Sequence, residues 1–260
     1  MKPEPNMSSR EPAIRINDLT VTYEESHHMV KVLDHIDLTV EQGQICALIG
    51  PSGCGKSTLL RAVAGLTHDY EGTVAINGEP VDPHRLSIGF MPQNYGLLPW
   101  KNVRDNVELA CRIKKQPVAQ EKRDRLLSDL GLAGFEQRYP RELSGGQQQR
   151  VGLAREFLLE PDLLLMDEPF SALDAITREE MQNIFLNLWQ KNSVTTLLVT
   201  HYVEEALYLA QTIVVFSASP GRVRRVIVNP LAGDRAARGG QQFQQLANQL
   251  HDMLRGEVEH

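Results

Sequence analysis

One short block constrains the fold of this chain more than any other feature. The block reads GPSGCGKST and consists of Gly50, Pro51, Ser52, Gly53, Cys54, Gly55, Lys56, Ser57 and Thr58. It fits the pattern of a glycine, four residues, a glycine, a lysine and a serine or threonine. The apolar run ICALI has strand length and precedes the block, and the helix-compatible run TLLRAVAGL overlaps its end and continues beyond it. This order of strand, loop and helix predicts an α/β fold whose loop binds phosphate.

Each residue type in this loop suits contact with a polyanion. Glycines at 50, 53 and 55 are expected to adopt positive φ angles and to turn backbone N–H groups inward, which a Cβ would obstruct. The positive end of the following helix dipole adds to the attraction. Lys56 would reach the β- and γ-phosphates, and the Ser57 hydroxyl would bind Mg²⁺. The alternative is a glycine-rich turn with a surface lysine, which the flanking patterns disfavour.

A second apolar run ends in two carboxylates. LLLMDEP, at 163–169, has the composition of a buried parallel strand, and Asp167 and Glu168 follow its apolar part. Ligands collect at this end of the strands in open α/β sheets. Asp167 is placed to hold the metal, directly or through water, and Glu168 to act as general base on the attacking water. Two adjacent acids predict hydrolysis as well as metal binding; the alternative is a solvated acidic turn before Pro169.

A third block, LSGGQ at 143–147, makes the chain resemble the nucleotide-binding subunits of ABC transporters, because LSGGQ is the signature sequence of that family. Its serine and glycines precede a predicted helix and form a second anion-binding N-terminus. The resemblance implies that this block faces the γ-phosphate held by the phosphate loop of a second subunit. The residues concerned are Ser144, Gly145, Gly146 and Gln147. Taken in isolation, the segment also fits a flexible linker before a glutamine-rich helix.

The resemblance assigns roles to further residues. Tyr23, in TVTYEE, matches the aromatic residue that stacks on adenine, although a tyrosine on an alternating strand also fits simple packing. Gln93, in FMPQNYG, matches the glutamine that touches Mg²⁺ and the lytic water and lies on the lever toward the membrane partner. SALD ends in Asp174 and resembles the loop that crosses to the opposite subunit, where Asp174 would contact the nucleotide site. His201, in LLVTHYVEEA, matches the histidine that senses the γ-phosphate, against the alternative of a structural histidine.

The order of the motifs predicts the architecture. Strand-like runs between about 12 and 92, and again after 162, indicate a P-loop NTPase core with a mainly parallel sheet and an N-terminal antiparallel β subdomain. Between about 94 and 155 the strand signals vanish, and periodic patterns such as VRDNVELACRIKK predict an inserted α-helical subdomain.

These patterns also set the expected domain limits. We expect an ABC-type ATP-binding domain over 12–225 and a C-terminal extension over 226–260. The extension should contain a terminal helix with one apolar face made by Phe243, Leu246, Leu250 and Leu254. Docking of this helix on the core is the simplest interpretation of that face.

Composition limits the class of protein. With 260 residues, 42% of them hydrophobic, the chain is long enough for one sizeable α/β core. Its formal net charge of −6 argues against a nucleic-acid binder, which needs a basic face. The three cysteines show neither metal-ligand spacing nor a disulfide framework, as expected for a reducing compartment.

The sequence shows no pattern from which we would expect a secretory signal or a membrane-spanning segment. The segment 1–12 has no apolar core, so it does not have the pattern of a secretory signal. No run approaches the roughly 18 to 20 apolar residues that cross a bilayer. The resemblance to ABC transporter subunits then implies a peripheral protein on the cytoplasmic side of the inner membrane, with transmembrane permease subunits supplied by other chains. It also implies that each ATP site needs elements from two subunits, so we expect a homodimer.

Three further segments resemble the importer group for nitrate, alkanesulfonates and taurine. They are NYGLLPWKNVRDNV, DEPFSALDAITREEM and FSASPGRV. The resemblance implies an ATPase that drives a permease, supplied indirectly by an extracytoplasmic solute-binding protein, with ATP and Mg²⁺ as ligands. Ser171 departs from the glycine often found there, and Tyr202 from the commoner aspartate. Trp100 is either an apolar anchor for a coupling helix of the permease or a buried core residue.

Two other classes remain as alternatives. One is a soluble ABC-type ATPase acting on DNA, ribosomes or chromosomes, but the sequence shows no tandem cassette, long coiled coil or basic extension of the kind such proteins carry. The other is a regulatory module that binds ATP without useful hydrolysis. The presence of Glu168, Gln93 and His201 disfavours that second alternative.

Overall fold

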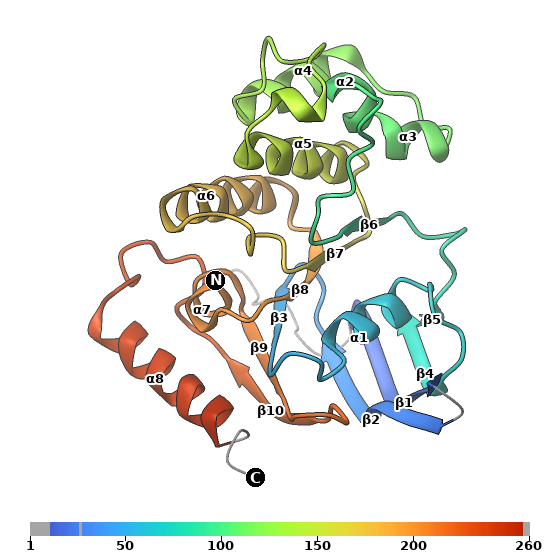
Figure 1. Cartoon of the computed structure of the whole chain (residues 1–260), viewed down its shortest axis with the longest axis vertical. Helices are drawn as coiled ribbons and strands as arrows, with labels where there is room; N and C mark the ends of the chain where they lie inside the picture. Colours follow the sequence, from blue (N-terminus) through green and yellow to red (C-terminus); the bar gives the residue numbers. More distant parts are fainter. Residues whose placement is uncertain (1–10, 26–27, 257–260) are drawn as a thin grey trace, which may run out of the picture.

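The computed structural model describes residues 11–25 and 28–256. Residues 1–10, on which most of the argument against a secretory signal depends, lie outside these ranges. Figure 1 shows two β-sheets in the lower and middle parts of the molecule and a group of helices above them.

The N-terminal sheet is antiparallel and carries the strand order β2-β1-β4-β5. Its strands are β1 (Ile14–Glu25), β2 (His28–Val40), β4 (Glu71–Ile76) and β5 (Glu79–Pro80). Ile14 is paired with Val40 on one side and with Ile76 on the other, and all three side chains are buried. One face of this sheet therefore packs into a core that it shares with the helix after the phosphate loop.

The second sheet is mainly parallel and has the order β10-β9-β3-β8-β7-β6. Its strands are β3 (Ile45–Ile49), β6 (Ile88–Met91), β7 (Leu163–Asp167), β8 (Thr195–Val199), β9 (Thr212–Phe216) and β10 (Val223–Val228). Every residue of β3 and β8 is buried, as expected for parallel strands covered on both faces. Only the edge strand β10 runs antiparallel to its neighbour. Both predicted sheets are thus confirmed.

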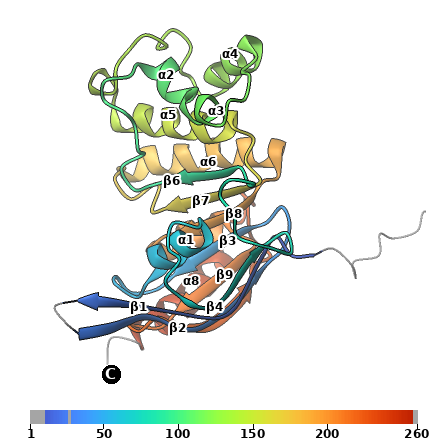
Figure 2. The ribbon, with the colours of Figure 1, turned by 90° about the vertical axis from the view of Figure 1, so that its right-hand side faces the viewer.

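The helices fall into two groups. Around the sheets lie α1 (Lys56–Val63), α6 (Ala175–Asn192), α7 (Val203–Leu209) and α8 (Gln241–Arg255). The inserted group comprises α2 (Val103–Val107), α3 (Leu109–Ile113), α4 (Gln120–Asp129), the 3₁₀ turn Pro140–Glu142 and α5 (Gly145–Leu158). Figure 2 shows α5 and α6 one above the other, between α2–α4 and the parallel sheet. Within residues 11–25 and 28–256, no helix combines the length and the apolar character needed to cross a bilayer.

The terminal helix α8 begins just before Phe243. Phe243, Ala247 and Leu250 are buried, and Leu246 and Leu254 pack against the same core. The apolar face expected from the sequence therefore lies against the body of the protein, alongside α7.

Candidate active site

The phosphate loop joins β3 to α1 at the carboxyl end of the parallel strands. Gly55 precedes the first residue of α1 and has a φ of 95°. A Cβ at this position would lie 2.6 Å from Cδ2 of Leu33 and 3.0 Å from the carbonyl oxygen of Val32. Any other residue would therefore be strained and would collide with β2.

A glycine is needed at position 50 for a reason other than the positive φ angle expected from the sequence. Positive φ angles occur at Gly53 and Gly55 but not at Gly50. A Cβ at Gly50 would lie 2.8 Å from Cβ of Phe216, at the end of β9. Gly50 is thus required by the close approach of a neighbouring strand, and not by its own backbone conformation.

Lys56 is held within the loop by backbone carbonyls. Its Nζ donates hydrogen bonds to the carbonyl oxygens of Gly50, at 2.8 Å, and Pro51, at 2.9 Å. Lys56 also lines a cavity of about 220 Å³, together with residues of the phosphate loop, one residue of β2 and the carboxylate residue Glu168. The other residues lining it are Val32, Ser52, Gly53, Gly55, Ser57, Thr58 and Glu168. A buried ammonium and a cluster of glycines thus face one small cavity, the chemistry expected for binding phosphate.

Ser57 and Asp167 meet beside this cavity. The Ser57 hydroxyl donates a hydrogen bond of 2.9 Å to Oδ1 of Asp167, the last residue of β7. Burial raises the pKa of Asp167; its hydrogen bond from Ser57 lowers that pKa, and the nearby charge of Glu168 raises it. An alcohol and a carboxylate that face each other are oxygen ligands of the type that Mg²⁺ binds, so these two residues fit a metal site.

Glu168 has an uncommon backbone conformation for a residue with a side chain. Its φ is 47°, and its N–H donates a 2.9 Å hydrogen bond to the carbonyl of Val199 on β8. Side chains other than glycine rarely adopt this region, and such residues concentrate at functional sites. Here it accompanies a carboxylate that lines the phosphate cavity.

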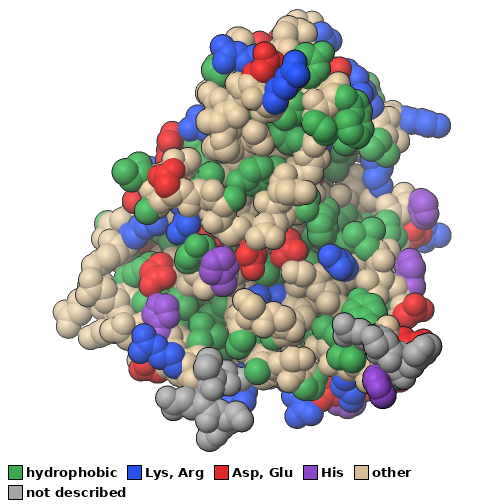
Figure 3. Space-filling view, viewed as in Figure 1, with side chains coloured by type: hydrophobic (Ala, Val, Ile, Leu, Met, Phe, Trp, Pro, Cys, Tyr) green, Lys and Arg blue, Asp and Glu red, His purple; other side chains and the backbone are tan. Residues whose placement is uncertain are grey.

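Two further predicted residues converge on the carboxylate of Glu168. Nδ1 of His201 lies 3.2 Å from Oε2 of Glu168, and Nε2 of Gln93 donates to the same oxygen at 3.4 Å. Gln93 also donates to the hydroxyl of Ser171 at 3.5 Å. The face drawn in Figure 3 shows acidic side chains with a histidine beside them midway between the upper and lower parts of the molecule. Residues from four separate sequence segments thus surround one site.

The signature block does not line the phosphate cavity of its own chain. Ser144 caps α5, because its Oγ accepts from the N–H of Gln147 at 3.3 Å while the side chain of Gln147 accepts from the N–H of Ser144 at 2.9 Å. A Cβ on Gly146 would lie 3.0 Å from Cγ2 of Thr177, in the first turn of α6. The signature therefore lies beside the start of α6.

Asp174 and Tyr23 also lie outside that cavity lining. Asp174 caps α6 and accepts from the N–H groups of Ile176 and Thr177, both at 3.1 Å. Hydrogen bonding from Thr177 is the main cause of its lowered pKa. Tyr23 is exposed on β1, opposite Val30. The structure therefore gives Asp174 a capping role, and it leaves the predicted nucleotide contacts of both residues as predictions.

Two residues near the site were not predicted from the sequence. Gln149 is fully buried on α5 and donates a 3.0 Å hydrogen bond to the carbonyl of Pro169, so it joins the signature helix to the loop after Glu168. The guanidinium of Arg178 lies 4.1 Å from the ring centroid of Tyr202, next to His201, and donates to the carbonyl of Leu173 at 2.7 Å. In sequence, both are ordinary polar residues near a helix start, where a solvated position is the common interpretation.

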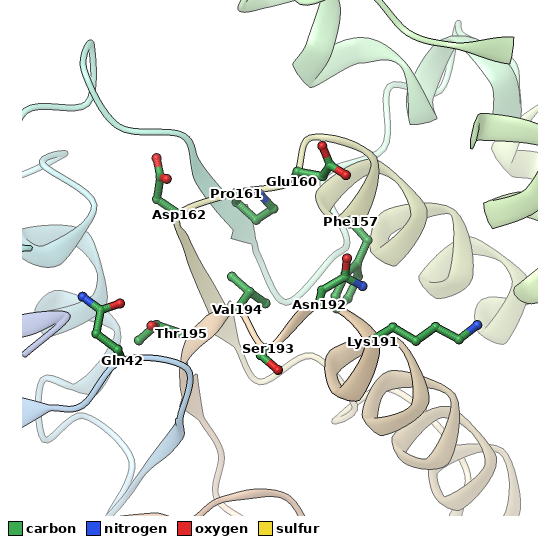
Figure 4. A pocket seen from close by; sticks show the side chains of 10 residues that line it. All are labelled: Gln42, Phe157, Glu160, Pro161, Asp162, Lys191, Asn192, Ser193, Val194 and Thr195. Carbon is green, nitrogen blue, oxygen red and sulfur yellow. The ribbon is translucent and has the colours of Figure 1, made fainter. Parts of the chain in front are cut away.

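A larger cavity, of about 410 Å³, lies at the opposite end of the parallel strands, where β7 and β8 begin. It is lined by Gln42, Phe157, Glu160, Pro161, Asp162, Lys191, Asn192, Ser193, Val194 and Thr195. Figure 4 shows these side chains around the amino ends of β7 and β8. Ligands of open α/β sheets bind at the carboxyl ends of the strands, and none of the predicted site residues lines this cavity. It is therefore not the candidate active site.

A phosphate loop with two carboxylates, a glutamine and a histidine around it defines a P-loop nucleotide hydrolase. Comparison with known proteins narrows that class, because the sequence model described as ABC transporter matches residues 33–171. The chain belongs to the ABC transporter family, and it is one of the ATP-hydrolysing subunits of that family. The predicted family and activity are thus confirmed.

Individual relatives cover most of the chain. An aliphatic sulfonates import ATP-binding protein of Bacillus thuringiensis is 41% identical, over 91% of this chain and 94% of its own length. A taurine import ATP-binding protein of Escherichia coli is 45% identical over 74% of this chain and 76% of its own length. The dimeric structure of the ATP-binding cassette MJ0796 with bound ADP and phosphate has a TM-score of 0.73 and 30% identity, and it covers 83% of this chain and 98% of that one.

Proposed function

We propose that this chain is the motor subunit of an ABC importer for small sulfonate anions, alkanesulfonates or taurine. The observation that carries the motor role is the convergence of His201 and Gln93 on Glu168, directly beside the phosphate loop. The import of sulfonates is supported by the similarity to the aliphatic sulfonates and taurine import proteins, which favours these anions over nitrate, the other anion expected from the sequence.

The site residues divide into those that bind ATP and those that act on it. The N–H groups of the phosphate loop and Lys56 bind the β- and γ-phosphates, and Tyr23 stacks on the adenine. Ser57 and Asp167, with Gln93, would hold Mg²⁺, which neutralises charge on the phosphate oxygens when it is bound. The 2.9 Å contact between Ser57 and Asp167 supports this assignment.

Glu168 is the general base in this proposal. Its carboxylate takes a proton from water as the water oxygen forms a bond to the γ-phosphorus, and the bond from that phosphorus to the β–γ bridging oxygen breaks, which releases ADP and phosphate. His201 and Gln93 keep the Glu168 carboxylate correctly oriented toward the γ-phosphate. Their approach to the same Glu168 oxygen, at 3.2 and 3.4 Å, supports these roles.

A second copy of the chain completes each site. Ser144, Gly145, Gly146 and Gln147 would contact the γ-phosphate bound to the partner, and Asp174 would lie at the same interface. The position of the signature beside the start of α6, away from its own phosphate cavity, supports this arrangement. The MJ0796 cassette, which resembles this chain, is dimeric in its post-hydrolysis state.

Contact with the permease is assigned to the inserted helical group and to the turn at Trp100 that immediately precedes α2. Trp100 is 70% exposed, which disfavours the alternative of a buried core residue. A large exposed aromatic residue is the usual anchor of a protein interface. The protein would then act at the cytoplasmic side of the inner membrane. A solute-binding protein on the other side would reach it only through the permease, and no nucleic acid takes part.

The test is to recover the chain from detergent-solubilised membranes and to reconstitute it with the polytopic protein that accompanies it. ATP hydrolysis is then measured with an alkanesulfonate, taurine or nitrate, each with its solute-binding protein. The proposal expects recovery of a permease and stimulation by a sulfonate. Recovery of soluble partners alone, with turnover unaffected by any solute, would instead favour a non-transport ATPase.

A further inference from the structure

The C-terminal extension is attached to the helix that follows His201. Figure 1 shows α8 alongside α7. Nδ2 of Asn229 donates to the carbonyls of Leu207 and Ala210, both at 2.8 Å, and so satisfies the end of α7. On α8, Nε2 of His251 lies 3.0 Å from Oε1 of Glu204, in the first turn of α7. The extension therefore contacts both the first turn and the C-terminal end of α7.

A chain of hydrogen bonds also begins at the partly buried Arg238 in the extension and ends at the buried Glu205. The Arg238 guanidinium lies 4.2 Å from the ring centroid of Tyr208 and donates from Nη2 to Oε1 of Gln182, at 2.9 Å. Nε2 of Gln182 then donates to Oε2 of Glu205, also at 2.9 Å. Arginine can only donate, so the amide of Gln182 must present its oxygen to Arg238 and its nitrogen to Glu205. All the bonds of the chain therefore point toward Glu205.

Glu205 connects this chain to the turn that carries His201. Glu205 lies in the first turn of α7, four residues after His201. The N–H of Ala206, next to Glu205, donates to the carbonyl of Tyr202 at 3.2 Å, and the N–H of Tyr202 donates to the Thr200 hydroxyl at 3.0 Å, which closes the backbone around His201. The bond from Gln182 to Glu205 therefore holds the start of the helix that follows this turn.

We propose that Arg238, Gln182 and Glu205 are positioning residues for His201, through a hydrogen-bond chain that the C-terminal extension completes. This inference rests on the proposed role of His201 in ATP hydrolysis. Arg238 lies beyond residue 225, the end that we propose for the ATP-binding domain, so the extension contributes to catalysis without touching the nucleotide.

The ionisation of Glu205 fits this role. Its side chain is 2% exposed, and burial raises its pKa to about 7, against the lowering effects of Thr200, Gln182 and the Arg178 charge. The charge of Glu168, from the loop after β7, adds to the raised value. Glu179 lies 3.8 Å from Nη1 of Arg238, at the outer end of the chain. Since Nε2 of Gln182 donates to Glu205, the charged carboxylate is the form that accepts this bond most strongly.

The first experiment compares Arg238→Met with Arg235→Met in the full-length chain. Methionine keeps an unbranched apolar side chain over the Tyr208 ring but cannot donate. Arg235 is a matched control, because it is in the same segment and donates to Asn187 on α6, at 3.2 Å, without reaching Gln182. For Arg238→Met we expect a fall in kcat of about fivefold with an unchanged KM for ATP, the usual scale for one lost hydrogen bond. Arg235→Met should match the parent chain.

A second background separates positioning from general stability. In His201→Ala, single-turnover hydrolysis should show no further loss on adding Arg238→Met, because the chain acts through His201. Equal losses in both backgrounds, or equal kcat for the two arginine variants, would overturn the inference. Full turnover in His201→Ala itself would instead overturn the proposed role of His201. Arg238→Lys, which can still donate to Gln182, should restore most of the lost kcat.

Glu205→Gln gives an independent readout if Arg238→Met does not fold. A neutral amide oxygen accepts the bond from Gln182 more weakly than a carboxylate does, so the chain is weakened at every pH. The kcat of the parent chain, divided by that of Glu205→Gln, should rise as pH increases through about 7, the pKa of Glu205. A ratio that does not vary with pH would overturn the inference.

Discussion

Nδ1 of His201 lies 3.2 Å from Oε2 of Glu168, and this contact joins the loops that follow β8 and β7. The register of the sheet brings the two loops together, since Asp167 pairs with Val199 across the parallel strands. Glu168 and His201 leave the sheet just beyond that pair. The backbone of the sheet, and not loop packing, therefore sets the distance between the proposed base and the proposed γ-phosphate sensor.

Glu168→Gln tests the general base directly. We expect turnover to fall by at least about two orders of magnitude, the scale of a lost general base, while ATP affinity stays as in the parent chain. Phosphate release and titration with a fluorescent ATP analogue measure the two quantities. Glu121→Gln, an exposed carboxylate on α4, is the control and should leave both unchanged. Near-normal turnover in Glu168→Gln would remove this residue from the role.

Lys56→Ala should act on binding. The variant loses the ammonium that faces the phosphate cavity and also two hydrogen bonds within the loop, to Gly50 and Pro51. We expect a weaker ATP affinity by at least about tenfold, since a bond to a charged group contributes about 1.5–3 kcal/mol. Lys191→Ala removes an exposed lysine near the amino ends of the parallel strands, away from the phosphate loop, and should bind ATP normally. An unchanged affinity in Lys56→Ala would contradict the assigned phosphate contact.

Trp100→Ala should separate hydrolysis from coupling. In the isolated chain we expect the parent rate of hydrolysis, because Trp100 is exposed and does not line the phosphate cavity. In the reconstituted complex, solute stimulation should be lost with the aromatic anchor. Leu66→Ala, another exposed apolar side chain but outside the helical group, serves as control. Full stimulation in the tryptophan variant would place the permease contact elsewhere.

Glu205 also predicts a dependence of stability on pH. Burial raises its pKa from 4.5 to about 7 in the folded protein. The folded state therefore holds the proton more tightly, and the stability gained from it is present at low pH and is lost as pH rises from about 4.5 through about 7. Glu205→Gln does not titrate, so its Tm relative to the parent chain should rise over this interval and then level off. Thermal melts across that range measure it; a constant difference in Tm would contradict the burial effect.

The sequence predicts the parts of the site that depend on one strand, one loop or one helix start. The phosphate loop, the acids after β7 and the fold follow from such local patterns, and the fold is confirmed. Contacts such as Gln149 with Pro169, or Gln182 with Glu205, join different elements and depend on how α5, α6 and α7 pack. No periodic pattern encodes that packing. Gly50 illustrates the same limit, because the strand end that requires a glycine there is distant in sequence.

The central claim is that each ATP site combines the phosphate loop of one copy with the signature of another. It is tested most directly by mixing Lys56→Ala and Ser144→Ala at an ATP concentration at which each variant alone hydrolyses little ATP, after circular dichroism has shown that both fold, Ser144→Ala despite its lost cap on α5. A mixed dimer then contains one intact site, so the mixture should regain up to about a quarter of the parent turnover. Turnover that stays at the mean of the two separate variants would contradict a site shared between two chains.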